Sequence, residues 1–142
     1  MARPKERKVG KKKILLVDDD PDLVEAMKII LENKSYDVAV AHDGKEGLKK
    51  VETEQPNLII LDVMMPEIDG YEMCAKLKSD PQYGHIPILL LTAVGEAIST
   101  TTYTKEMGMR MEADDYIPKP VELTELVERV EKLFRISAEK TP

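Results

Sequence analysis

Five short apolar runs that alternate with segments of helical periodicity constrain the fold of this chain more than any other feature. The first run, Ile14–Val17, is continuously apolar, as expected of a strand buried on both faces. The predicted strands cover residues 14–17, 36–41, 57–63, 86–92 and 115–117. Strands that alternate with helices form a parallel sheet with right-handed crossovers. The chain is therefore predicted to be an α/β protein with a doubly wound five-stranded parallel sheet and helices on both faces.

The segments between the runs carry helix signals. Asp20-Pro21 supplies an N-cap and a first-turn proline, and apolar residues then recur at helical spacing over residues 23–31. Further helical patterns lie around residues 48–51, 71–79 and 123–134, of which the last is a strong closing helix. These patterns place a helix after each of the first three strands and after the fifth.

Composition limits the class of protein. With 142 residues, 42% of them hydrophobic and 34% charged, the chain has room for one globular domain with an adequate core. No apolar stretch approaches the roughly 20 residues that span a bilayer, and no signal-peptide pattern follows the basic start. We therefore expect a cytoplasmic location and no membrane insertion. The single cysteine, Cys74, cannot form an internal disulfide and is interpreted as a buried helix residue.

The first 13 residues are strongly basic. They hold seven Lys and Arg residues against Glu6, an excess of six positive charges in a chain whose formal net charge is −6. Such an arm could contact nucleic acid or an acidic membrane surface, but no aromatic residue interleaves the lysines, so a solubilising tail is the favoured interpretation. The expected organisation is a basic arm over residues 1–11, one domain over 12–136 and a short tail over 137–142.

Reactive side chains stand where the predicted strands end. Asp18 and Asp19 follow the first strand, Asp62 lies at the end of the third, Thr92 lies at the end of the fourth and Lys119 lies just past the fifth. Open parallel sheets bind ligands beyond the carboxyl ends of their strands. These five side chains are therefore expected to converge on one edge of the sheet.

Three carboxylates in a small volume repel one another unless a cation lies between them. Hard oxygen donors favour Mg²⁺, which binds one or two carboxylates, keeps several waters and completes its shell with phosphate oxygens. We therefore predict Mg²⁺ as the cofactor, held by Asp18, Asp19 and Asp62. In that setting Asp62 is the predicted nucleophile that forms an acyl phosphate, while Lys119 and Thr92 contact the phosphoryl group.

Four motifs at these strand ends resemble those of a known family. They are Val17-Asp18-Asp19, the stretch Leu61–Gly70, Leu91-Thr92-Ala93 and the stretch Ala113–Pro120. Together they resemble the receiver domain of two-component response regulators, and the resemblance covers residues 12–136. It implies a flavodoxin-like strand order 2-1-3-4-5 and a stand-alone, CheY-like phosphorelay protein rather than a turnover enzyme.

The resemblance also implies a partner and a metal site. Asp62 would accept a phosphoryl group from a phosphohistidine on a sensor histidine kinase or a phosphotransfer protein. Asp18 and Asp19 would hold Mg²⁺ together with Asp62 and the backbone carbonyl of Met64. The phosphorylated form would then bind a downstream protein target differently from the unmodified form.

Thr92 and Lys119 would bind the phosphoryl oxygens by the same resemblance. Tyr116 would be the switch aromatic, which moves inward as Thr92 moves toward the phosphate, and Lys119-Pro120 would be a cis peptide. Taken singly, Thr92 is more often a strand-end hydroxyl, Lys119 a surface lysine and Tyr116 a core residue. The joint occurrence at one sheet edge favours the functional interpretation.

Four acids near these motifs receive structural interpretations. Asp20 is assigned to capping of the first helix, and Asp22 complements the dipole in its first turn, so neither is assigned to the metal. Asp114 and Asp115 are interpreted as turn residues.

The segment between Thr92 and Lys119 departs from the family. These two residues are 27 positions apart, longer than the usual receiver spacing, and Ser99–Thr104 is a poor helix former. The fourth helix is therefore expected to be short, displaced or loop-like, and three alternating methionines over residues 107–111 leave an added extended segment open. The oligomeric state is left open too, with a phosphorylation-dependent dimer as one candidate.

Three other functions compete with this interpretation. A phosphatase with an aspartyl nucleophile places a second acid two residues after that nucleophile, where this chain has Met64, which cannot transfer a proton. A flavin-binding protein of the same sheet order needs a phosphate loop after the first strand, where three acids would repel the ligand. A scaffold that is not phosphorylated is opposed by the intact set of acids, Thr and Lys.

The expected output is contact with a protein. Only eight residues follow Phe134, too few for a DNA-binding or enzymatic domain, so no direct DNA binding is expected if the chain is complete. A fragment of a longer regulator or of a hybrid kinase stays open as an alternative.

Overall fold

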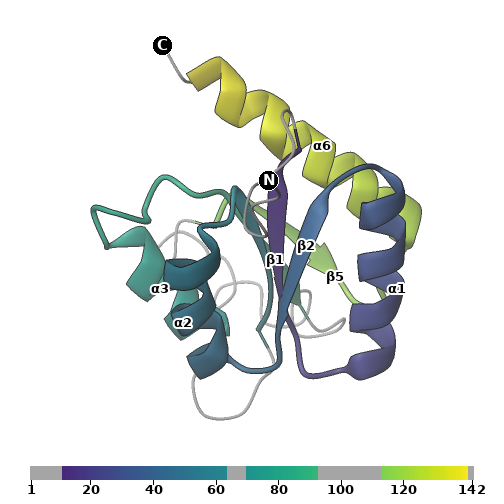
Figure 1. Cartoon of the computed structure of the whole chain (residues 1–142), viewed down its shortest axis with the longest axis horizontal. Helices are drawn as coiled ribbons and strands as arrows, with labels where there is room; N and C mark the ends of the chain where they lie inside the picture. The colour runs from purple at the N-terminus through teal and green to yellow at the C-terminus, as the bar shows by residue number, and fades with distance from the viewer. Residues whose placement is uncertain (1–10, 64–69, 93–112, 141–142) are drawn as a thin grey trace, which may run out of the picture.

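The computed structural model describes residues 11–63, 70–92 and 113–140. In this part of the chain five strands form one sheet with helices on both faces (Figure 1). The strands are β1 Lys13–Val17, β2 Asp37–Ala41, β3 Leu58–Asp62, β4 Ile88–Thr92 and β5 Asp115–Pro118. The helices are α1 Pro21–Asn33, α2 Gly44–Glu54, α3 Gly70–Lys78 and α6 Leu123–Lys140.

All neighbouring strands are parallel, and their order across the sheet is β2-β1-β3-β4-β5. This confirms the predicted doubly wound α/β fold with strand order 2-1-3-4-5. Parallel neighbours need long crossover connections, which contain α1 between β1 and β2 and α3 between β3 and β4. The carboxyl ends of the strands therefore lie at one edge of the sheet, the lower edge in Figure 1.

The central strands are buried because helices cover both faces of the sheet. β3 and β4 are buried along their whole length, and β1 is buried from its second residue. Ile14 and Leu16 pack with α1 and α6, whereas Leu15 and Val17 pack with α2 and α3. Figure 1 shows these two pairs of helices on opposite sides of the sheet. The first strand therefore has the two-sided burial that its sequence indicates.

Helix starts follow the capping residues. The Asp20 side chain accepts hydrogen bonds from the backbone N–H groups two and three residues further on, so α1 begins at Pro21 as predicted. The Asp43 side chain caps α2 by accepting from the N–H of Glu46 at 2.7 Å. Cys74 is a free, buried cysteine of α3, which confirms its interpretation as a buried helix residue.

Asp115 begins β5, which confirms the predicted strand over residues 115–117 and makes the other interpretation, as a turn residue, wrong; the interpretation of Asp114 misses its partners. Asp115 is the first residue of β5, and its carboxylate pairs with Arg129 of α6 at 2.8 Å. The Asp114 carboxylate accepts from the backbone N–H of Ile88 at 2.8 Å and pairs with Lys78 Nζ at 2.9 Å. Both acids tie β5 to elements that are distant in sequence, and a local pattern does not reveal such partners.

Several expectations fall outside the described residues. They concern the backbone carbonyl of Met64, the fourth-helix region over residues 94–112 and the basic arm as far as residue 10. At the other end α6 extends to Lys140, so the helix continues past the expected domain boundary at residue 136. Among the helices of the described part, none is long and apolar enough to cross a membrane.

Candidate functional site

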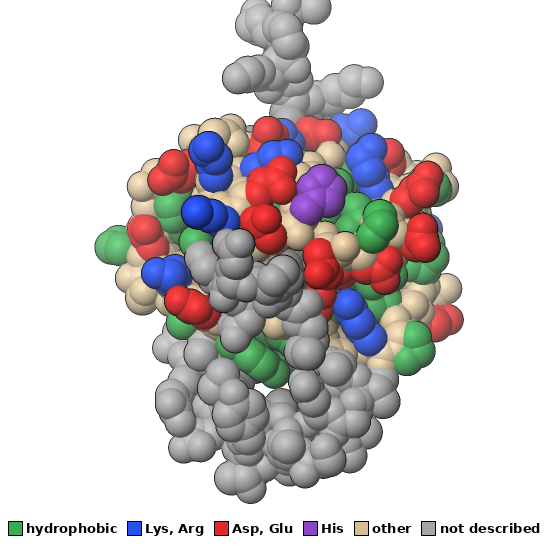
Figure 2. All heavy atoms as spheres, turned by 90° about the horizontal axis from the view of Figure 1, so that it is seen from below, with side chains coloured by type: hydrophobic (Ala, Val, Ile, Leu, Met, Phe, Trp, Pro, Cys, Tyr) green, Lys and Arg blue, Asp and Glu red, His purple; other side chains and the backbone are tan. Residues whose placement is uncertain are grey.

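Three carboxylates meet at the carboxyl edge of the sheet. Asp18 and Asp19 directly follow β1, and Asp62 is the last residue of β3, which pairs with β1. One carboxylate oxygen from each residue lies within 4.8 Å of the other two. Figure 2 shows the molecule from this side, where acidic side chains gather on the surface next to a histidine. The structure therefore brings together the three acids that the sequence analysis selected.

Asp18 is a buried carboxylate, and one of its oxygens faces the Lys119 ammonium at 3.6 Å without a hydrogen bond. Its exposed fraction is 0%, against 1% for Asp62, whereas Asp19 lies at the surface. Asp18 Oδ1 accepts a hydrogen bond from the backbone N–H of Asp20 at 2.9 Å, but Oδ2 has no hydrogen-bond partner among the described residues. Burial raises the pKa of Asp18, and the hydrogen bond from Asp20 and the charge of Lys119 only partly oppose this effect.

Lys119 brings one positive charge to the three acids. Its Nζ lies 3.3 Å from Asp62 Oδ1 and 3.6 Å from Asp18 Oδ2. Its backbone N–H donates to the carbonyl of Thr92 at 2.7 Å, which holds this residue against the end of β4. The Lys119–Pro120 peptide bond is cis, as the resemblance implied. Three carboxylates facing one ammonium leave two excess negative charges.

Thr92 ends β4 at the same edge of the sheet. Its side chain is 2% exposed, and Oγ1 has no hydrogen-bond partner among the described residues, so the hydroxyl is available to an oxygen ligand. Tyr116 pairs in register with Leu90, whereas the partner of Thr92 is Pro118. The half-buried Tyr116 ring packs on the side of the sheet that α3 covers, and burial raises the pKa of its hydroxyl.

The donor set fits a hard divalent cation. Carboxylate oxygens are ligands that Mg²⁺ and Ca²⁺ prefer, and one divalent cation would balance the two excess charges. The unsatisfied oxygen of Asp18 supports this fit, because buried polar atoms rarely lack a partner. Asp18, Asp19 and Asp62 are the described residues that could hold the ion. Met64, which the resemblance adds through its carbonyl, lies outside the described residues.

Gly70 shapes the site without a side chain, a role that sequence reasoning missed. Its N–H donates to the carbonyl of Val63 at 3.2 Å, where α3 begins against the end of β3. A Cβ at this position would lie 2.6 Å from Val63 Cα and would press on the backbone of Asp62. A glycine at the start of a helix that follows the acidic strand end was the signal that could have revealed it.

Curated relatives of the chain are transcriptional regulators. The alkaline phosphatase synthesis transcriptional regulatory protein PhoP of Bacillus subtilis is 44% identical over 131 residues, which cover 92% of this chain and 52% of PhoP. The DNA-binding dual master transcriptional regulator RpaA of Synechocystis is 40% identical over 123 residues, which cover 87% of this chain and 49% of RpaA. The chain thus spans about half the length of the curated relatives that it matches.

A solved structure supports the same relationship. The response regulator protein TrrA of Thermotoga maritima, in complex with Mg²⁺-BeF, is 34% identical to this chain with a TM-score of 0.73. The match covers 86% of this chain and 98% of the TrrA chain. Almost the whole of that solved chain therefore corresponds to the domain described above.

The relatives overturn one expectation. Because few residues follow Phe134, we expected no direct DNA binding. The curated relatives contradict this expectation. PhoP is a transcriptional regulator and RpaA is DNA-binding by name. Because the chain spans only half of each relative, the residues that follow its last helix are no basis for excluding a nucleic-acid partner.

A family model confirms the assignment over most of the chain. The model for the response regulator receiver domain matches residues 14–131, which include all five strands except the first residue of β1. The same range contains the acid cluster and Lys119. From the matched range, the strand order and the identity to response regulators, this chain belongs to the response regulator receiver domain family.

Proposed function

We propose that Asp62 accepts a phosphoryl group in the presence of Mg²⁺ and that the chain acts as a phosphorylation switch. The observation that carries this proposal is the cluster of Asp18, Asp19 and Asp62, with Lys119 Nζ 3.3 Å from Asp62 Oδ1. The donor is a phosphohistidine of a sensor histidine kinase or of a phosphotransfer protein. Membership of the receiver family supports this choice of donor.

Asp62 is the nucleophile of the proposed reaction. One of its carboxylate oxygens attacks the phosphorus and forms a new P–O bond, while the bond from phosphorus to the donor nitrogen breaks and its electron pair stays on the imidazole. The residue ends a fully buried strand, which holds the carboxylate in position. Such a fixed position matters because phosphoryl transfer depends mainly on positioning and charge stabilisation.

Lys119 and Thr92 stabilise the transferred group. Lys119 Nζ lies beside Asp62 and places a positive charge where negative charge develops on the phosphoryl oxygens. The Thr92 hydroxyl, which has no hydrogen-bond partner among the described residues, donates a hydrogen bond to one of those oxygens. Tyr116 is proposed as the aromatic that responds to the movement of Thr92, and its half-buried position on β5 beside β4 supports this role.

Mg²⁺, when bound, neutralises the charge of the carboxylates and of the phosphoryl oxygens. Asp18, Asp19 and Asp62 would supply oxygen ligands to the ion, and the carbonyl of Met64 is proposed as a fourth ligand. The related TrrA structure supports the pairing, because it contains Mg²⁺ together with BeF, a group that stands in for a phosphoryl group.

The proposed activity is a single acceptance of a phosphoryl group rather than turnover on free substrates. An aspartyl phosphatase needs a general acid two residues after its nucleophile, and Met64 occupies that position. We propose that phosphorylation changes a surface that binds a downstream partner. The transcriptional roles of the curated relatives support an output in gene regulation. The cytoplasmic location and the phosphorylation-dependent dimer stay predictions.

Intact mass measurement after incubation with acetyl phosphate and Mg²⁺ tests the proposal. Wild type and the control Asp22→Asn should each gain one phosphoryl group, whereas Asp62→Asn should gain none. Asp22 is a matched control because it is an exposed acid in the first turn of α1, outside the cluster. Chelation of Mg²⁺ should abolish the gain. Wild type that stays unmodified, or Asp62→Asn that is modified as fully as wild type, would refute the proposal.

A further inference from the structure

Charge differs between the two edges of the sheet. The carboxyl edge holds the acid cluster of the candidate site, and Figure 2 shows further acidic side chains at this end of the molecule, with Lys and Arg side chains among them. The chain enters β1 at the opposite, amino edge through three consecutive lysines, Lys11, Lys12 and Lys13. The preceding ten residues hold four more basic residues and only one acid. The proposed phosphorylation site uses none of these charges.

The three lysines differ in their partners. Lys13 Nζ pairs with Glu54 at 2.7 Å and with Asp37 at 3.7 Å, so its charge is largely balanced within the fold. Lys11 and Lys12 pair with no acid in the described part of the chain. Two positive charges at the amino edge are therefore available to a partner molecule.

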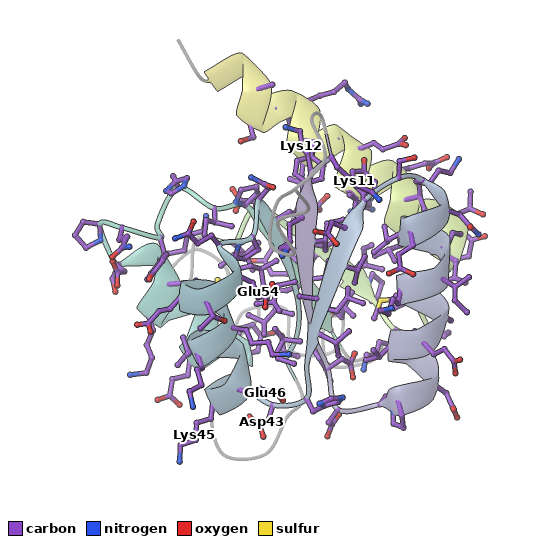
Figure 3. All side chains as sticks on the ribbon, viewed as in Figure 1. Lys11, Lys12, Asp43, Lys45, Glu46 and Glu54 are labelled. Carbon is purple, nitrogen blue, oxygen red and sulfur yellow. The ribbon has the colours of Figure 1, made fainter. Side chains whose placement is uncertain are left out.

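Packing positions Lys12 at the surface beside α6. The side chain is exposed, and its Nζ lies 5.6 Å from the centroid of the Phe134 ring. That ring stacks on Tyr36 with 5.4 Å between centroids. Figure 3 shows Lys11 and Lys12 at the end of the molecule opposite to Lys45.

A cleft of about 180 Å³ adjoins Lys12. Its polar lining residues include Asn57, His85 and Ser137, and no acid is among the described residues that line it. The exposed Arg135 lies in the same turn of α6 as the cleft-lining residues Phe134 and Ser137. Among the described residues, the lining of the cleft therefore combines Lys12 with hydrogen-bonding groups and contains no carboxylate.

We propose that the amino-edge surface, formed by Lys11, Lys12, Arg135 and this cleft, binds the phosphate backbone of double-stranded DNA. Lysines without acidic partners gain ion pairs on a polyanion, and binding releases the counterions condensed on the duplex. Residues 1–13 contain no aromatic side chain that could stack on a base, so the contact reads phosphates and is independent of base sequence.

The composition of this surface favours DNA over an acidic membrane. Stable membrane association needs apolar anchoring in addition to positive charge. Residues 1–13 contain no aromatic residue, leucine or isoleucine, and Ile136 is the single large apolar side chain that is exposed on the described part of α6. The acids at the carboxyl edge repel phosphates, so the duplex meets the molecule at its amino edge.

Fluorescence anisotropy with a labelled duplex of arbitrary sequence tests the proposal on the full chain. Wild type should bind weakly at about 50 mM salt and lose most of its affinity by about 200 mM. The double variant Lys11→Gln/Lys12→Gln should bind about tenfold more weakly, and its slope of log affinity against log salt should fall by about 2. The control Lys45→Gln/Lys49→Gln removes the same charge from exposed positions of α2, and its affinity should change by less than about twofold.

Three results would overturn the proposal. They are equal weakening in the two double variants, no binding of wild type to the duplex at low salt, and binding to phosphatidylserine vesicles in place of the duplex. Melting temperatures check that both variants fold. Asp62→Asn should bind the duplex as wild type does, because Asp62 lies at the other edge of the sheet, so this test is independent of the phosphorylation test.

Discussion

Asp18 combines features that rarely occur together in one carboxylate. It is fully buried, one of its oxygens has no hydrogen-bond partner among the described residues, and two further acids lie close by. Burying a charged group costs free energy of folding unless a counter-charge compensates it, and Lys119 at 3.6 Å provides only part of that compensation. The carboxylate therefore suits a metal site better than it suits the unliganded fold.

Replacing Asp18 with Asn should stabilise the metal-free protein. The change removes a buried negative charge and keeps an oxygen that can accept from the N–H of Asp20. We expect the free energy of unfolding to rise by about 1–2 kcal/mol, because the cost of burying the charge and its repulsion with the neighbouring acids are lost. Urea unfolding without metal measures this change. Mg²⁺ should raise the melting temperature of wild type and leave that of Asp18→Asn unchanged, and an equal response of both proteins would contradict the assignment of Asp18 to the metal.

The advantage of Asp18→Asn over wild type should grow with pH. Burial raises the pKa of Asp18 above its ordinary value of 3.8, so the folded state binds more protons than the unfolded state. The penalty is absent below pH 3.8, develops as pH rises through that value and is complete above the raised folded pKa. Urea unfolding of both proteins without metal, at mildly acidic and at neutral pH, measures the difference. A difference that does not change with pH would argue against ionisation of Asp18 as its source.

The positions of the candidate site residues at the strand ends could be predicted from sequence, whereas their electrostatic surroundings could not. Asp62 and Thr92 were predictable because each ends an apolar run, and the ends of parallel strands share one edge of the sheet. The unsatisfied oxygen of Asp18 and the 3.3 Å distance from Lys119 to Asp62 depend on side-chain geometry. No local pattern of residues determines such distances.

At the scale of elements, the junction of β3 and α3 is closely packed. The N–H of Gly70 donates to the carbonyl of Val63, and the space that a Cβ would need is occupied by backbone atoms. Backbone cannot move aside as the end of a flexible side chain can. The start of α3 is therefore fixed directly against the strand end that carries Asp62.

Gly70→Ala should be more disruptive than Gly47→Ala. The Gly70 substitution must displace backbone near Asp62 and should lower the free energy of unfolding by about 2–3 kcal/mol. At Gly47 the close neighbours are the side chains of Met73 and Val17, and the better helix propensity of Ala offsets part of the crowding. Gly47→Ala should therefore stay within about 1 kcal/mol of wild type. Urea unfolding measures both changes, and the reverse ranking would refute this account of the junction.

The helices and strands were largely predictable from sequence. Some of their ends were not, because contacts between distant segments decide them. The third strand was predicted over residues 57–63 and covers Leu58–Asp62. Asn57 lies just before this strand. Its side chain accepts a hydrogen bond from the N–H of Lys13, and a local pattern does not reveal such a contact between segments far apart in sequence. For the same reason the ion pair between Asp115 of β5 and Arg129 of α6 was not predicted.

At the scale of the whole molecule, one sheet separates two hydrophobic layers. Met27 belongs to the layer under α1 and α6, and Met73 belongs to the layer under α2 and α3; both side chains are 0% exposed. The buried strands contribute alternate residues to each layer. Loss of either layer therefore exposes the strands on which the other layer depends, and the two should unfold together.

Met27→Ala and Met73→Ala form a matched pair that tests this coupling. Each variant should lose about 2–5 kcal/mol of unfolding free energy, the usual range for truncating a large buried side chain to Ala. Each should still unfold in one transition that is the same by far-UV circular dichroism and by Tyr fluorescence. Two separated transitions in either variant would show that the layers are independent units.

The complete burial of β3 and β4 has a consequence for the choice of phosphodonor. Folding removes the conformational freedom of the strand ends that carry Asp62 and Thr92, so these groups need little reorganisation when a donor arrives. The entropic part of the activation barrier for phosphoryl transfer should then be small. The main requirement on the donor is therefore a good leaving group on its phosphorus atom. Even a donor without a protein surface should therefore react, and a kinase would add rate and selectivity to a reactivity that the receiver already has.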